Sequence, residues 1–161
     1  MPELKYKIAG INILIQSAFK IDTNERYDIF KTDCDIADYT ISFKKTMSLP
    51  DYQLIDLNTD KDRMISIYKY NDCYIQANLF GLEGSKYAYS YFTGDSYLKI
   101  EYISEKQFQT IDKCFEKIGI ENILYRFDSF IIHSSFINYK DNGIVFVGPS
   151  GIGKSTRADL W

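Results

Sequence analysis

The sequence is poor in cysteine, histidine and proline. Its 161 residues include three cysteines, three prolines and a single histidine, His133. Cys34, Cys73 and Cys114 are far apart in the chain and form no C-x-x-C pair, which argues against a structural zinc site. Their odd number favours reduced thiols. The N-terminus lacks the basic start and apolar stretch of a secretory leader, so we expect a cytoplasmic protein.

Runs of basic residues and long hydrophobic runs are missing as well. The formal net charge is −3, and Lys and Arg are scattered along the chain. Nucleic acid is therefore not an expected partner, because affinity for it depends on clustered basic residues that contact phosphates. No apolar segment approaches the length needed to cross a bilayer, so we expect no membrane partner either.

Aromatic residues, by contrast, are abundant. Fourteen Tyr and eleven Phe raise the aromatic share to 16%, which favours strands over helices. Alternating apolar and polar residues predict strands at residues 5–16, with a β-bulge at Ala9-Gly10, and at residues 39–43. Further runs predict an antiparallel meander with strands at residues 64–70, 73–80, 87–92 and 97–103. The connections between them, at residues 71–72, 81–84 and 93–96, are rich in Asn, Asp and Gly.

Helical periodicity begins at residue 104. Ser104 and Gln107 match a capping box and Gly119 a helix stop, so a helix is predicted at residues 104–118. Its apolar face consists of Phe108, Ile111, Phe115 and Ile118. A shorter helical piece is predicted at residues 121–126. Strands follow at 130–138 and 144–147, joined by a turn at 141–143 whose Asn-Gly pair is typical of hairpins.

The most specific pattern is a phosphate-binding loop near residue 150. The match to G-x-x-x-x-G-K-[ST] is complete and consists of Gly148, Pro149, Ser150, Gly151, Ile152, Gly153, Lys154, Ser155 and Thr156. The glycines let the backbone curl so that several N–H groups face an anion. We expect Lys154 to reach the β- and γ-phosphates of ATP, or of another nucleoside triphosphate, and Ser155 to be a ligand of Mg²⁺.

The alternative interpretation is a Gly-rich connector that happens to precede a Lys-Ser pair. The neighbouring segments argue against it. The apolar run at residues 144–147 is typical of a buried strand, and residues 156–160 are compatible with a helix. Strand, loop and helix thus occur in the order that a nucleotide-binding motif requires.

The segment around the loop resembles the active-site entry of the HPr serine kinase family, which shares a P-loop fold with the phosphoenolpyruvate carboxykinases. ABC transporter ATPases and guanylate kinases share the string G-P-S-G-x-G-K-S, so the resemblance depends on the strand before it, where His133 precedes Ser134 and Ser135. It covers residues 120–161 and is closest to kinase-like relatives in bacterial peptide-modification clusters. Residues 1–103 share only a strand-rich layout.

The resemblance implies a catalytic role for two residues. His133 would lie near the transferred phosphate, where imidazole can hydrogen-bond to or protonate an oxygen, and Lys154 would hold the phosphates. The alternative for His133 is a structural histidine on a buried strand. Arg157 and Asp159 are expected on a solvated helix face rather than at the nucleotide or metal.

We therefore expect an α+β fold. A largely antiparallel β-rich region at residues 1–103 leads into residues 104–161, where a helix, a hairpin and the loop start a carboxykinase-like P-loop kinase core; one continuous domain is the alternative. The expected function is the N-terminal part of an ATP-dependent phosphotransferase, a kinase of a serine in a protein or peptide.

The acidic residues that such kinases carry after the loop are absent from residues 1–161. We therefore expect residues 148–161 to be poorly packed and this chain alone to be inactive in transfer. One alternative is a non-catalytic nucleotide-binding or interaction module in a peptide-maturation system. Another is an ABC-type ATPase, but the aromatic base-stacking residue expected shortly before its loop is not evident.

Overall fold

The computed structural model describes residues 2–50, 55–60, 65–70, 73–80 and 85–161. The chain divides into two compact units, Met1–Asp128 and Ser129–Trp161. The expected division after residue 103 differs from this one, because the helices that follow residue 103 pack with the sheet of the first unit. No helix among the described residues is long and apolar enough to span a membrane.

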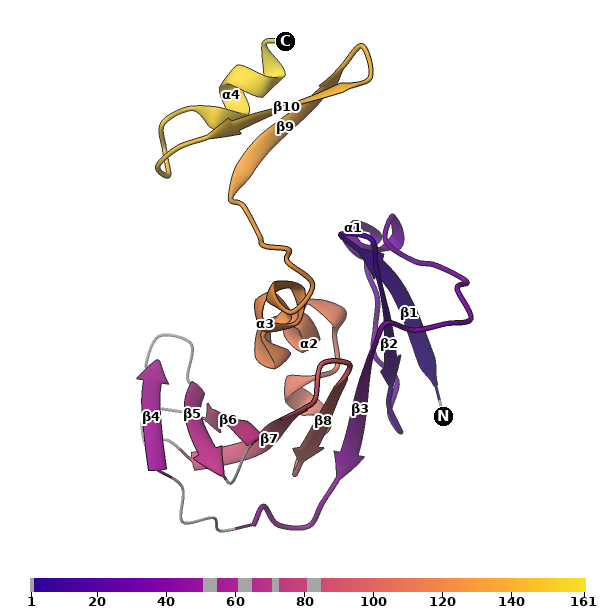
Figure 1. Ribbon diagram of the computed structural model, residues 1–161, viewed down its shortest axis with the longest axis vertical. Helices are drawn as coiled ribbons and strands as arrows, with labels where there is room; N and C mark the ends of the chain where they lie inside the picture. Colours follow the sequence, from indigo (N-terminus) through magenta and orange to yellow (C-terminus); the bar gives the residue numbers. More distant parts are fainter. Residues whose placement is uncertain (1, 51–54, 61–64, 71–72, 81–84) are drawn as a thin grey trace. The chain divides into compact units, whose positions relative to one another are not determined.

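The first unit contains one sheet, which has eight strands within the described residues, in the order β1-β2-β3-β8-β7-β6-β5-β4 (Figure 1). These strands are β1 (Glu3–Ile8), β2 (Ile11–Gln16), β3 (Tyr39–Lys45), β4 (Ile55–Asp60), β5 (Ile65–Tyr70), β6 (Cys73–Phe80), β7 (Ser85–Thr93) and β8 (Tyr97–Tyr102). The pairs β2–β3 and β3–β8 are parallel, and the other neighbouring pairs are antiparallel. The fold is thus mixed, with a mostly antiparallel sheet, as expected.

The predicted meander is confirmed for β5 to β8, and the second predicted strand corresponds to β3. The connection predicted at residues 93–96 joins β7 to β8. The connections predicted at residues 71–72 and 81–84 lie outside the described residues. Strand β4 was not predicted.

The strand predicted at residues 5–16 is two strands. Ala9 and Gly10 form a two-residue turn with positive φ angles of 52° and 84°, and Ile8 pairs with Ile11. Such a left-handed pair matches the twist of an antiparallel hairpin. The change in apolar phase at Ala9-Gly10 therefore reflects a reversal of chain direction, and the prediction of a β-bulge is wrong.

The helix predicted at residues 104–118 is interrupted. A 3₁₀ turn, η1 (Glu105–Gln107), comes first and α2 (Ile111–Ile118) follows. Between them the backbone pairs with Asp22, whose N–H donates to the Gln109 carbonyl at 2.7 Å and whose carbonyl accepts from the Ile111 N–H at 3.0 Å. Backbone groups that pair with another segment are not available to a helix. The prediction of one continuous helix is therefore wrong.

Helix α2 has a cap at each end. The Thr110 side chain accepts from the Lys113 N–H at 3.5 Å, and Gly119 ends the helix with φ 68°, as predicted. The short helix α3 (Ile120–Tyr125) follows directly and confirms the piece predicted at residues 121–126. Another short helix, α1 (Glu25–Asp28), lies between β2 and β3.

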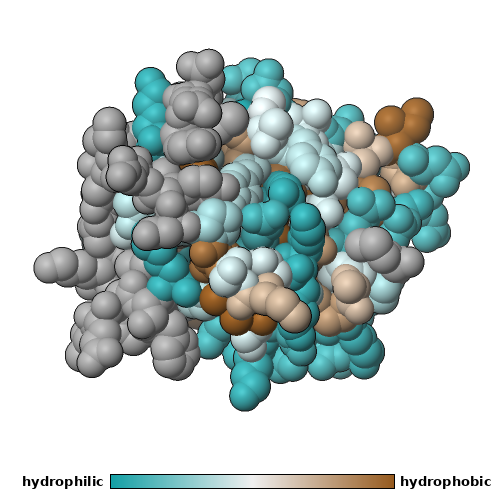
Figure 2. All heavy atoms as spheres, turned by 90° about the horizontal axis from the view of Figure 1, so that it is seen from below, coloured by the Kyte–Doolittle hydropathy of each residue, from teal (hydrophilic) through white to brown (hydrophobic). Residues whose placement is uncertain are grey.

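The main core of the first unit lies between the sheet and the helices. The predicted apolar face of α2 is buried there, and Cys114 is buried with it. Sheet residues that share this core include Tyr6, Ile13, Tyr39, Ile41, Phe43, Leu98, Ile100 and Tyr102. Figure 2 shows one face of the molecule, on which hydrophobic residues occur in small groups between hydrophilic ones.

One carboxylate of the sheet links stability to pH. Glu101 on β8 is only 14% exposed in its side chain and accepts from Lys99 Nζ at 2.7 Å and from the Tyr91 hydroxyl at 3.0 Å. Burial pushes the pKa of Glu101 up, but these two hydrogen bonds and the nearby charge of Lys44 outweigh it, so the pKa lies below its ordinary value. The bonds thus favour the ionised carboxylate.

We expect the free energy of unfolding of Glu101→Gln to fall less steeply with decreasing pH than that of the wild type. A carboxyl whose pKa is lowered by folding stabilises the native state above its unfolded-state pKa, and this contribution is lost as the pH falls through its folded-state pKa. At neutral pH the substitution should lower the free energy of unfolding by about 1 kcal/mol. Urea unfolding of both proteins between pH 7 and pH 3 measures this. Glu116→Gln, at a side chain 65% exposed, is the control; parallel curves for wild type and Glu101→Gln would contradict the assignment.

The second unit is a hairpin followed by a helix. It consists of β9 (Ser134–Tyr139), β10 (Asn142–Val147) and α4 (Lys154–Asp159). The strand predicted from residue 130 begins only at Ser134, which pairs with Val147, the last residue of β10. Residues 130–133 pair with no strand of the described residues, because the chain leaves the hairpin after Val147.

The turn of this hairpin is formed by Lys140 and Asp141. Both have positive φ angles, 49° and 62°, and Asn142 already belongs to β10. The turn predicted at residues 141–143 is therefore displaced. Gly143 leaves room for a neighbouring ring, because a Cβ there would lie 2.7 Å from the Phe136 ring.

Candidate phosphate-binding site

Strand, loop and helix follow one another in the second unit as the motif requires. Strand β10 ends at Val147, the loop occupies residues 148–153, and α4 begins at Lys154. The predicted order is confirmed. No residue of α4 is buried, and its C-terminal neighbour Leu160 is 78% exposed, so this segment is poorly packed, as expected.

Two glycines give the loop its curvature. Gly151 and Gly153 have φ angles of 80° and 90°, a region that side chains other than glycine rarely adopt. Neither residue donates its backbone N–H to a described residue. The motif therefore has glycine where the backbone needs it, and the loop carries backbone donors that remain available to an anion.

Lys154 lies across the loop. Its Nζ donates to the carbonyl oxygens of Gly148 and Pro149, both at 3.0 Å. An ammonium group has three N–H donors, so one donor remains. These contacts keep the positive charge at the loop, where the motif requires it for phosphate binding.

Ser155 has a hydroxyl partner that the sequence did not reveal. The Oγ atoms of Ser155 and Ser135 are 3.3 Å apart, because the face of β9 that carries Ser135 packs against α4. The only signal for Ser135 in the sequence was its place in the His-Ser-Ser segment. Ser155, the expected magnesium ligand, therefore contacts β9, the strand that follows His133.

His133 is exposed and lies just before β9. It makes no hydrogen bond to a residue that the structure describes. The alternative of a histidine held on a buried strand is therefore not what the structure shows. His133 lies two residues before Ser135, which contacts Ser155. Its catalytic role stays a prediction.

A cavity of about 500 Å³ lies beside the loop. Its lining residues are Phe146, Val147, Ile152, Gly153, Lys154, Thr156, Arg157 and Leu160. Two cations and no carboxylate occur among them. Arg157 and Asp159 are both exposed, as expected for a solvated helix face, and Arg157 also lines the cavity.

The donor set suits magnesium bound together with phosphate. Among the described residues no group of three His, Cys, Asp or Glu side chains could hold a metal ion by itself. Mg²⁺ commonly keeps several waters and takes few protein ligands in addition to substrate phosphates. A single hydroxyl, that of Ser155, is compatible with such a site.

Comparisons of the chain with protein-family models, with curated proteins and with solved structures found no match.

Proposed function

We propose that residues 148–156 bind the phosphates of a nucleoside triphosphate together with Mg²⁺, and that the chain belongs to a cytoplasmic ATP-dependent kinase of the HPr kinase type. The observation that carries the proposal is the complete motif in strand-loop-helix order, with Gly151 and Gly153 at positive φ and Lys154 held across the loop. The acceptor would be a serine of a protein or peptide.

Each loop residue has a role in this proposal. The available backbone N–H groups would donate to phosphate oxygens, and Lys154 would exchange its carbonyl partners for the β- and γ-phosphates. Ser155 would bind Mg²⁺, and the hydroxyl of Ser135, at 3.3 Å, would orient it. The bound Mg²⁺ would supply charge neutralisation of the phosphates.

The remaining residues would act around the phosphates. Arg157 adds a second positive charge to the cavity wall, and Thr156 adds a hydroxyl. His133 would hydrogen-bond to or protonate a phosphate oxygen in the family-based hypothesis. Transfer to a serine also requires a group that accepts the hydroxyl proton, and a carboxylate is the usual choice.

A second candidate function is nucleotide binding without transfer. It is favoured by the cavity lining, which contains no carboxylate among the described residues. A module of this kind would sense nucleotide or serve a peptide-maturation complex. Incubation with labelled ATP, Mg²⁺ and a serine peptide separates the two, and we expect no label transfer by the 161-residue chain alone. Lys154-dependent transfer by this chain would overturn that expectation.

Substitution of Ser155 tests the magnesium ligand. We expect Mg²⁺ to strengthen ATP binding to the wild-type chain and to have about tenfold less effect on Ser155→Ala, because the only protein ligand proposed for the metal is removed. Ser155→Thr keeps a hydroxyl and should retain the effect. Calorimetric titrations with ATP, with and without Mg²⁺, measure it. An equal enhancement of ATP binding by Mg²⁺ in wild type and Ser155→Ala would contradict the assignment of Ser155 as a magnesium ligand.

A further inference from the structure

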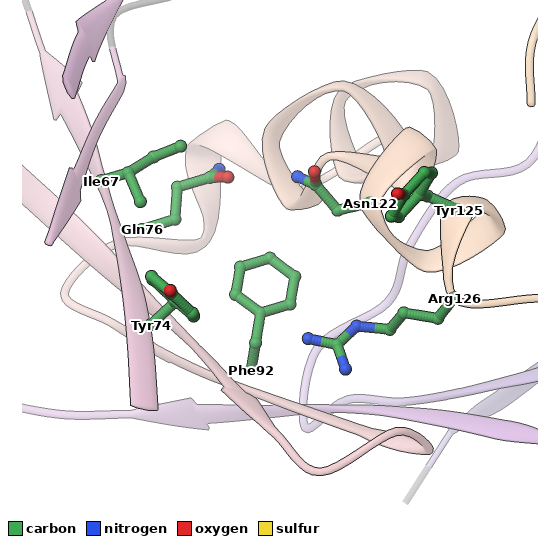
Figure 3. Close-up of a pocket in the computed structure, with 7 residues that line it drawn as sticks. All are labelled: Ile67, Tyr74, Gln76, Phe92, Asn122, Tyr125 and Arg126. Atoms are coloured by element: carbon green, nitrogen blue, oxygen red, sulfur yellow. The ribbon is translucent and has the colours of Figure 1, made fainter. Parts of the chain in front are cut away.

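The first unit contains a cavity of about 450 Å³ that the phosphate site does not use. Figure 3 shows it between one face of the sheet and helix α3, with side chains from β5, β6 and β7 on one side and from α3 and its C-cap on the other. This volume is within the range of cavities that bind small organic ligands. All residues that line it belong to one compact unit.

The sheet side of the cavity is mainly apolar. Tyr74 on β6 pairs directly with Phe92 on β7, and Ile67 on β5 pairs with Gln76, two residues further along β6. Side chains at such positions share a face of the sheet. Tyr74 is 51% exposed, so about half of this large aromatic residue at the cavity is open to solvent.

The helix side comes from one face of α3. Asn122, Tyr125 and Arg126 have the spacing i, i+3, i+4, which places them together on a helix surface. Tyr125 is 79% exposed. The cavity is therefore bordered by aromatic rings from both sides, a surface on which a planar ligand can stack.

A polar edge lies between the two sides. Gln76 is 2% exposed, and its Nε2 donates to Asn78 Oδ1 at 3.3 Å and to the Lys117 carbonyl at 2.7 Å. Both of its amide hydrogens are thus used, and only its Oε1 remains for a ligand. In Figure 3 the amides of Gln76 and Asn122 point toward each other across the cavity. Gly119 leaves room for this arrangement, since a Cβ there would lie 2.7 Å from Asn122 Nδ2.

Arg126 supplies the charge. Its Nη1 donates to the Gly94 carbonyl at 2.7 Å and to Asp95 Oδ1 at 3.2 Å, and its Cζ lies 5.9 Å from the centroid of the Phe92 ring. Its Nε and Nη2 groups donate to no described residue. The Asp95 side chain is 99% exposed, so this ion pair is weak and a better-placed anion can compete with it. No carboxylate is among the described residues that line the cavity.

A purely structural role explains only part of this arrangement. The hydrogen bond from Gln76 to the Lys117 carbonyl connects β6 to α2. Asn78 Nδ2 in turn donates to Ser90 Oγ on β7 at 3.4 Å. The amide donors of Gln76 and Asn78 are thus satisfied within the protein, and only Gln76 Oε1 is left for a ligand. The exposed rings of Tyr74 and Tyr125 and the uncommitted donors of Arg126 have no such partner in the described residues, and they point to a ligand.

We propose that this cavity binds a small planar aromatic anion. Its ring would lie among Tyr74, Phe92 and Tyr125, its negative group would accept from Arg126, and polar atoms on its edge would bond to Gln76 Oε1 and Asn122. Asp95 would then compete with the ligand for Arg126. The proposal is independent of the phosphate-binding loop and concerns the first unit only.

Two probes of equal shape test the charge requirement. 2-Naphthoate and 2-naphthamide differ only in carboxylate against carboxamide, and each is titrated into the ¹⁵N-labelled 161-residue chain while amide shifts are followed. We expect 2-naphthoate to bind with a dissociation constant of ~1 mM, as for a ligand of this size, and 2-naphthamide to bind at least about fivefold more weakly. The shifts should concentrate at α3 and β6.

Variants distinguish this site from nonspecific binding. Arg126→Gln should remove the preference for 2-naphthoate, Arg126→Lys should restore part of it, and Asp95→Asn should strengthen 2-naphthoate binding. Arg26→Gln, an exposed arginine on α1, is the matched control and should change neither affinity. Equal affinity for the two probes, an unchanged preference in Arg126→Gln, or no saturable shift of cavity residues with 2-naphthoate up to 10 mM would each overturn the proposal.

Discussion

Lys154→Ala should weaken Mg-ATP binding to the chain by at least about tenfold, which corresponds to about 1.4 kcal/mol. The Lys154 ammonium lies at the loop, bound to two of the loop's own carbonyl oxygens at 3.0 Å, so phosphate oxygens can replace those partners without a large movement of the side chain. Charge-assisted hydrogen bonds are among the stronger ones in proteins. Calorimetry or ³¹P NMR titration of wild type and variant measures the loss.

Two further substitutions separate charge from geometry. Lys154→Arg keeps the positive charge but replaces a compact ammonium with a planar guanidinium, so it should recover only part of the affinity. Lys113→Ala removes one positive charge from an exposed position on α2 and should leave Mg-ATP binding unchanged. Equal affinity of wild type and Lys154→Ala would rule out a phosphate site at this loop.

Phe108→Ala should lower the free energy of unfolding of the first unit by about 3–5 kcal/mol. Phe108 is fully buried, and its ring centroid lies 5.1 Å from that of Phe43 and 6.1 Å from that of Tyr102. Its carbonyl oxygen also accepts from the Cys114 thiol at 3.0 Å, and burial raises the pKa of that thiol to about 12. The substitution would leave a cavity where η1, α2 and the sheet meet. Urea unfolding followed by circular dichroism gives the value.

An exposed neighbour provides the comparison. Ile103 lies just after β8 and is 40% exposed, so Ile103→Ala should cost less than about 1 kcal/mol. A similar small loss in Phe108→Ala would show that Phe108 is not part of a cooperative core. If the slope of the unfolding transition also changed, the substitution would have altered how much surface unfolding exposes.

One difference between expectation and structure arises where distant segments meet. Periodicity located α2 and its apolar face because those features depend on neighbouring residues only. The break before α2 depends on Asp22, whose backbone bonds to Gln109 and Ile111 and which lies far away in the sequence. A pattern confined to residues 104–118 carries no information about that partner.

The bulge predicted at Ala9-Gly10 and the turn predicted at residues 141–143 were wrong for a common reason. Ala9-Gly10 and Lys140-Asp141 both turn the chain with two residues at positive φ, although each pair contains a non-glycine residue in that strained region. Pairing of the flanking strands compensates for the strain. The preferred Asn-Gly pair at residues 142–143 lies in β10 instead, where Gly143 accommodates the Phe136 ring.

Short-range chemistry alone determined the candidate phosphate site. The glycines, Lys154 and Ser155 are contiguous, so the motif contains the geometry that it needs, and the sequence also determined which short runs become strands, because alternation is local. Only the tertiary structure decided that Ser135 contacts Ser155 and that Gln76, Phe92 and Arg126 surround one cavity. These residues come from strands and helices distant in the chain, and what brings them together is burial of apolar surface, which is not directional and leaves no local pattern.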